Sequence, residues 1–123
     1  MLSVYAKTLG TVTVLGLNGQ IVNGETHILR NAVDLLPETS AVILDLARVT
    51  TVDAHGLGVM LELRENALSK GIRFKLMNVN EPLHRILEIT RLDSVFETIS
   101  KVEFFPTVSR EHRAAFSALK SCA

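Results

Sequence analysis

The sequence predicts an α/β fold, in which helices connect the strands of a sheet. Residues 41–46 form a short apolar run that is rich in β-branched side chains, which is typical of a strand buried on both faces. Residues 54–69 then change to helical spacing, with Leu57, Met60 and Leu61 on one stripe. After an initial hairpin, strand-like and helical runs alternate, which favours helical crossovers between strands.

Each expected element has a local signal. The strand-like runs, which are β-rich or alternate in polarity, are 3–7, 11–17, 41–46 and 72–77. The helical runs, which repeat apolar residues every three or four positions, are 24–36, 54–69 and a run that begins after Asn80. Asn23, Asp53 and Asn80 are suited to cap helix N-termini, and Gly71 is suited to end the second helix. In the first helix, the expected buried stripe consists of Ile28, Ala32, Leu35 and Leu36.

The C-terminal part has weaker signals. Residues 95–105 have strand composition, Pro106 interrupts them, and Ser109 is a candidate cap for an extra helix within 106–123. No internal repeat or linker divides the chain, so residues 1–123 are expected to form a single domain.

Composition excludes several function classes. Lys plus Arg and Asp plus Glu number 13 each, which disfavours nucleic acid or an anionic membrane as a partner. The single cysteine, Cys122, cannot form an internal disulfide. No apolar run approaches the roughly 20 residues of a membrane span, and no signal peptide is evident. A cytoplasmic protein that recognises its partner locally is expected.

The loop between the central strand and the second helix is the candidate site, because sites in α/β sheets are usually built at the carboxyl ends of strands. Gly56 and Gly58 lie in the first turns of that helix, where glycine lowers helix propensity. Close approach of another group to the backbone is the better explanation for them.

Catalysis at this loop is disfavoured. Asp53 and His55 are an acid-base pair by residue type, and Thr50 and Thr51 supply hydroxyls, but no nucleophile or phosphate-binding motif is present. A helix cap at Asp53 with a solvated His55 explains the pair more simply. The four histidines lie on separate elements without metal-ligand spacing, so neither a metal nor a cofactor is predicted.

A protein-binding site requires fewer specific side chains than a catalytic site. Val59 and Leu63 lie to one side of the main apolar stripe of the second helix. They form either an exposed patch for a partner or part of a wide stripe that packs on the sheet and a neighbouring helix. The sequence leaves both interpretations open.

The run VILDL at 42–46, followed by VTTVDAHGLGVM at 49–60, resembles the signature of STAS domains, the family of anti-sigma-factor antagonists and of sulfate-transporter tails. LHRILEITRLDSVF at 83–96 is similar to the family's second block. The resemblance spans 11 to about 99. It implies a STAS-like mixed sheet of four to five strands, with helices packed mainly on one face.

Three positions depart from the family pattern. Antagonists of the family carry a kinase-phosphorylated serine directly after the motif's Asp, and here that position is Ala54. At the next position, where the pattern also has serine, this chain has His55. Thr50 and Thr51 are therefore the hydroxyls that remain as possible phosphate acceptors near this position. Arg91 replaces a glycine after the third helix, and Val22 replaces an Asp that often precedes the first.

The resemblance therefore implies a regulatory binding module that is not switched by phosphorylation at Ala54. Expected partners are an anti-sigma factor or serine kinase-like protein, a signalling scaffold, or a second copy of the chain; a small-ligand sensor is an alternative and an enzyme is less favoured. The expected partner-binding residues are Thr51, Asp53, Ala54, His55, Gly56, Gly58, Val59 and Leu63.

Overall fold

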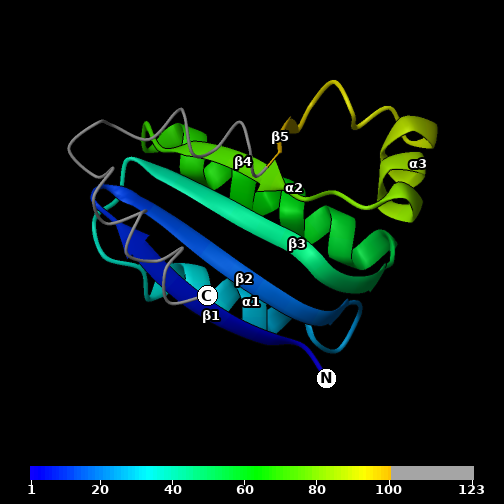
Figure 1. Cartoon of the computed structure of the whole chain (residues 1–123), viewed down its shortest axis with the longest axis horizontal. Helices are drawn as coiled ribbons and strands as arrows, with labels where there is room; N and C mark the ends of the chain where they lie inside the picture. The colour runs from blue at the N-terminus through cyan, green and yellow to red at the C-terminus, as the bar shows by residue number, and fades with distance from the viewer. Residues whose placement is uncertain (101–123) are drawn as a thin grey trace.

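The architecture was obtained as a computed structural model, which describes residues 1–100. Its elements, in chain order, are β1 (Ser3–Leu9), β2 (Val12–Ile21), α1 (Thr26–Asp34), β3 (Ala41–Val52), α2 (Ala54–Ser69), β4 (Arg73–Met77), α3 (Glu81–Ile89) and β5 (Glu97–Ile99). The strands form one sheet in the order β1-β2-β3-β4-β5 (Figure 1). The β1–β2 hairpin is antiparallel and the other pairs are parallel, which confirms the mixed sheet.

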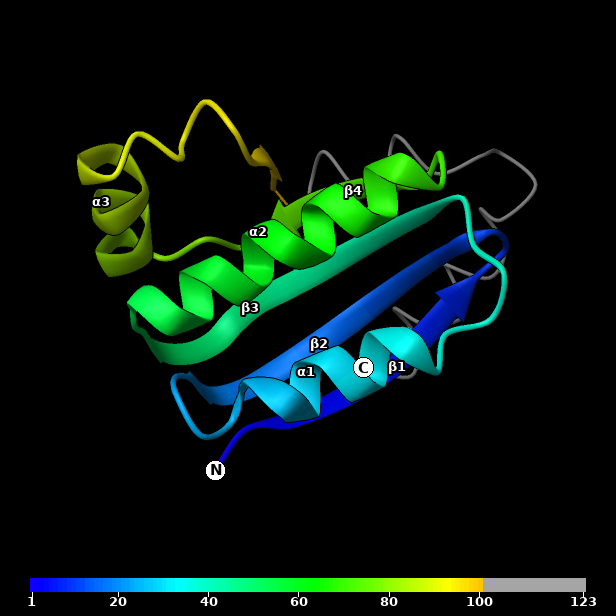
Figure 2. The ribbon, with the colours of Figure 1, turned by 180° about the vertical axis from the view of Figure 1, so that it is seen from behind.

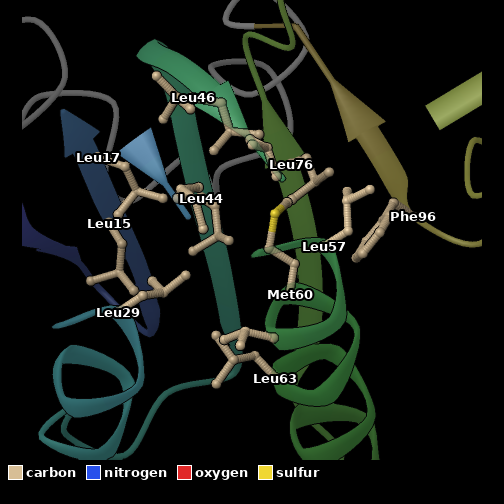
Figure 3. Packing of buried hydrophobic residues seen from close by; sticks show 14 of the residues in the cluster. Leu15, Leu17, Leu29, Leu44, Leu46, Leu57, Met60, Leu63, Leu76 and Phe96 are labelled. Atoms are coloured by element: carbon tan, nitrogen blue, oxygen red, sulfur yellow. The ribbon is translucent and has the colours of Figure 1, made fainter. Parts of the chain in front are cut away.

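Helices α1 and α2 lie side by side on one face of the sheet, and α3 stands at the end where β3 finishes (Figure 2). The hydrophobic core fills the space between this face and the helices. Figure 3 shows leucines of β2, β3 and β4 gathered with Leu29 of α1 and Met60 of α2. Buried alternate positions of β2, such as Leu15 and Leu17, show how a period of two directs one strand face to the core.

Strands β2 and β3 are longer than predicted. The Asn18-Gly19 pair, which follows the predicted strand 11–17, lies within β2, where the pairing with β3 shifts register. Gly19 has a φ of 117°, a conformation that favours glycine, and the backbone of Met1 packs against it. Because this extension of β2 pairs with residues 48–52, β3 continues beyond its predicted end at residue 46 to Val52.

Helix α1 is shorter than the predicted run 24–36, because it begins later and ends earlier. Asn23 is not its cap: the helix begins at Thr26, after Glu25, which makes no side-chain cap hydrogen bond. The helix ends at Asp34, so Leu35, expected in the buried stripe, lies at the C-cap and is 84% exposed. Leu29 is fully buried instead. The shifted boundaries changed which residues face the core.

The signals for α2 and α3 are confirmed. Asp53 and Asn80 cap the two helices through side-chain oxygens, and Gly71 follows α2 with a φ of 74°. Arg91 follows α3 with a φ of 61°, so the left-handed turn is kept without glycine. Within residues 1–100, no helix is long and apolar enough to cross a membrane. The predicted helix within 106–123 lies outside the described residues.

Candidate functional site

The junction between β3 and α2 is organised by the carboxylate of Asp53. One oxygen, Oδ1, accepts a hydrogen bond from the backbone N–H of Gly56 at 2.7 Å, which caps α2. The other oxygen, Oδ2, accepts from the backbone N–H of Asn23 at 3.0 Å. Asp53 therefore fastens the loop between β2 and α1 to the beginning of α2.

These hydrogen bonds also determine the charge of Asp53. The N–H of Asn23, then that of Gly56, holds the pKa of the carboxyl below its ordinary value of 3.8, and the nearby His55 acts in the same direction. Asp53 is therefore ionised at neutral pH. Because both of its oxygens accept backbone hydrogen bonds, this carboxylate serves as a structural clamp rather than as a general acid.

The two glycines of α2 differ in their surroundings. A Cβ on Gly56 would overlap the backbone carbonyl of Ile21, at the end of β2. The close approach inferred for Gly56 therefore comes from the chain itself. At Gly58, by contrast, a Cβ would meet no atom of residues 1–100 within 4 Å, and the residue is exposed. Internal packing does not explain a glycine at position 58.

The predicted site residues separate into exposed and buried groups. Asp53 is half-buried, and the exposed residues are Thr51, Ala54, His55 and Gly58. Gly56 is buried. The interpretation of Val59 and Leu63 as exposed apolar contacts is wrong, since their exposed fractions are 2% and 5% and both belong to the core. The alternative, a wide stripe packed between the sheet and its neighbours, is the correct one (Figure 3).

His55 bridges the two helices that cover the sheet. Its Nε2 lies 3.1 Å from Oγ1 of Thr26, the first residue of α1. Thr26 is 4% exposed, so this hydroxyl is among the few buried polar groups of the described chain. Thr26 and Asn23 are the junction residues that the sequence interpretation missed. Asn23 was predicted only as a helix cap, and nothing in the sequence indicated that the loop around it meets α2.

The junction lacks a catalytic arrangement within the described residues. A cavity of about 100 Å³ between the end of β3 and α3 includes Thr50 and Thr51 in its lining, but neither Asp53 nor His55. The hydroxyl of Thr50 donates to the carbonyl of Gly19 at 3.2 Å. Among residues 1–100, no cluster of three or more His, Cys, Asp or Glu could hold a metal ion.

Comparison with known proteins agrees with this fold. The STAS domain family model matches residues 3–110. A putative anti-sigma factor antagonist from Thermotoga maritima is 33% identical over 101 residues, which cover 77% of this chain and 89% of the relative. The Thermotoga neapolitana homolog of the putative anti-sigma factor antagonist TM1081 is 35% identical over 63 residues, covering 49% of this chain and 56% of that protein.

A solved structure shares the fold at lower sequence similarity. The Bacillus cell fate determinant SpoIIAA in its phosphorylated form superposes with a TM-score of 0.67 at 14% identity, covering 87% of this chain and all of that one. The family model spans most of the sequence, and the T. maritima relative is aligned over most of its own length. The chain belongs to the STAS domain family.

Proposed function

We propose that this STAS domain is a regulatory module that docks a protein partner through the junction surface, which we define as Thr51, Ala54, His55 and Gly58. The partner is an anti-sigma factor or a serine kinase-like protein. The single observation that carries the proposal is that these four residues stay exposed while Asp53 and Gly56, beside them, are used internally. The domain contributes binding and no catalysis.

Ala54 sets how the module is controlled. It is the first residue of α2 and is exposed, next to the ionised Asp53. A phosphorylated serine there would add about −1.5 to −2 charges, changing the surface that a partner meets. Alanine has no hydroxyl to modify. Position 54 therefore stays without a phosphate, and the exposed hydroxyls that remain beside it are those of Thr50 and Thr51.

Gly58 is a second observation in favour of docking at the junction surface. Glycine within a helix costs roughly 1 kcal/mol relative to alanine, and no atom of the described residues lies close enough to require glycine at this position. A partner backbone or side chain that packs directly on α2 supplies a reason for it. In this interpretation, Ala54 and Gly58, four residues apart on one helix face, allow the closest approach.

Calorimetry tests the proposal by measuring affinity for a purified kinase-like anti-sigma factor from the organism that encodes this chain. Ala54→Asp, which adds charge and volume, is expected to weaken binding at least tenfold. Ala54→Ser is expected to bind normally and to be released after incubation with kinase and ATP. Leu35→Ala, at a distant exposed residue, is the control. Equal affinity of Ala54→Asp and Leu35→Ala would contradict docking at the junction surface.

A second copy of the domain and a signalling scaffold are the alternative occupants of the same surface. Light scattering of the pure chain across a concentration series distinguishes self-association from hetero-docking. If the junction surface forms a homodimer, Ala54→Asp will yield a monomer. If the chain is monomeric at all concentrations and binds the kinase-like protein, the first proposal stands.

A further inference from the structure

A second concave site lies at the other end of the molecule. A cavity of about 190 Å³ opens between the C-terminal ends of α1 and α2, where β3 and β4 begin. Its floor is apolar and buried, and includes Val42, Leu63 and Phe74, each no more than 5% exposed. Its rim carries Asp34 from α1, and Asn66 and Lys70 from α2.

The polar groups of the rim are unpaired. Among the described residues, no hydrogen bond or ion pair involves the side chains of Asp34, Asn66 or Lys70. Thr39, which also lines the cavity, differs from them, because its hydroxyl donates to the carbonyl oxygen of Thr11 at 2.6 Å. The rim thus carries an acid, an amide and an ammonium group that are exposed and have no side-chain partner among residues 1–100.

The two charges stand on different helices. Asp34 is the last residue of α1, and Lys70 is the C-cap of α2. Asn66 lies four residues before Lys70, so both project from the same face of α2. A ligand with only a carboxylate would be attracted by Lys70 and repelled by Asp34, and one with only an ammonium group would meet the reverse. A ligand with both charges fits the pair.

We propose that this cavity binds a small zwitterion with an apolar side chain, of the class of hydrophobic α-amino acids. The ammonium group pairs with Asp34, the carboxylate pairs with Lys70 and Asn66, and the side chain contacts the floor. The volume is below the roughly 300–1,000 Å³ typical of pockets for drug-sized ligands, which agrees with a ligand of this size.

The cavity is separate from the junction surface. It lies at the first residues of β3, whereas Asp53 follows the last, and the 12 residues of this strand span roughly 40 Å. The proposed ligand site therefore does not depend on partner docking, and the two proposals can be tested independently.

The test is calorimetric titration of the full chain with L-leucine, L-methionine and L-phenylalanine. N-acetyl-L-leucine lacks the ammonium group and L-leucinamide lacks the carboxylate, and each is expected to bind about two- to fivefold more weakly than leucine, as for exposed ion pairs. Lys70→Gln should weaken leucine binding by a similar factor and remove the difference between leucine and leucinamide. The control is Glu38→Gln, an exposed charge outside the cavity lining.

Amide chemical shifts locate the site independently. Saturable leucine-induced shifts confined to residues 33–42 and 63–74 support the proposal. The absence of saturable binding for all three amino acids overturns it, as does a Lys70→Gln variant that binds leucine as tightly as Glu38→Gln. Because Lys70 and Glu38 are exposed, neither substitution removes buried packing.

Discussion

Exchanging each glycine of α2 for alanine should change stability in opposite directions. In Gly56→Ala, the new Cβ meets the backbone of Ile21, which cannot rotate away as a flexible side chain could. Overpacking of this kind typically costs about 1–3 kcal/mol, and alanine returns roughly 1 kcal/mol of helix propensity. Because the overlap is with backbone, the upper part of the range applies, and the net loss is about 1–2 kcal/mol.

Gly58→Ala is the matched control. The same helix gains the same propensity, but the Cβ enters open space, so the variant should be more stable by up to ~1 kcal/mol. Urea unfolding followed by circular dichroism measures both. With a urea m-value of about 1–3 kcal/mol/M, the Gly56→Ala midpoint should fall by roughly 0.3–2 M. Equal stability of the two variants would refute the packing argument, whereas a Gly58→Ala variant that is stabilised but binds its partner less tightly would separate folding from function.

Further substitutions test the Asp53 clamp, the turn after α3 and the core. Asp53→Ala should lose about 0.5–2 kcal/mol of stability, because the N-cap of α2 is lost. The carboxylate of Asp53, whose pKa is lowered, stabilises the wild type above about pH 3.8, and this stabilisation is lost as the pH falls below that value. Asp53→Asn keeps a capping oxygen but does not titrate, so its stability should fall less over the same acidic range. Arg91→Gly should stabilise by up to ~1 kcal/mol in urea unfolding by relieving a left-handed residue, whereas Thr90→Gly, at a φ of −84°, should not. Leu63→Ala should cost about 2–5 kcal/mol, as a buried leucine does, and a loss below 1 kcal/mol would contradict its place in the core.

The elements with strong local signals were predictable from the sequence. Helix α2 begins and ends where predicted because Asp53 caps it through a contact three residues away, and Gly71 supplies the positive φ that follows it. Asn80 likewise caps α3 at Leu83. Such contacts join residues that are close in sequence, so residue type and spacing are enough to predict where these helices begin and end.

The features set by distant contacts were not predictable. Asn23 has the composition of a helix cap, but its N–H donates to Asp53, 30 residues later. Val59 and Leu63 lie to one side of the α2 stripe and become core because β3, β4 and α1 surround this helix. The same limit applies to the glycines, since only the fold distinguishes Gly56, packed on Ile21, from the open Gly58.

The junction is ordered by the chain itself, and this has a consequence for regulation. Asp53 is satisfied by two backbone donors, Gly56 packs on β2, and His55 contacts Thr26. A surface built in this way needs little ordering when a partner binds, so affinity is not reduced by a folding cost. Under the proposed function, alanine at position 54 has no hydroxyl to phosphorylate, so phosphorylation there cannot release the partner and the domain should remain competent to bind. Control would then have to act on the partner, on the abundance of this chain, or at a site away from the junction.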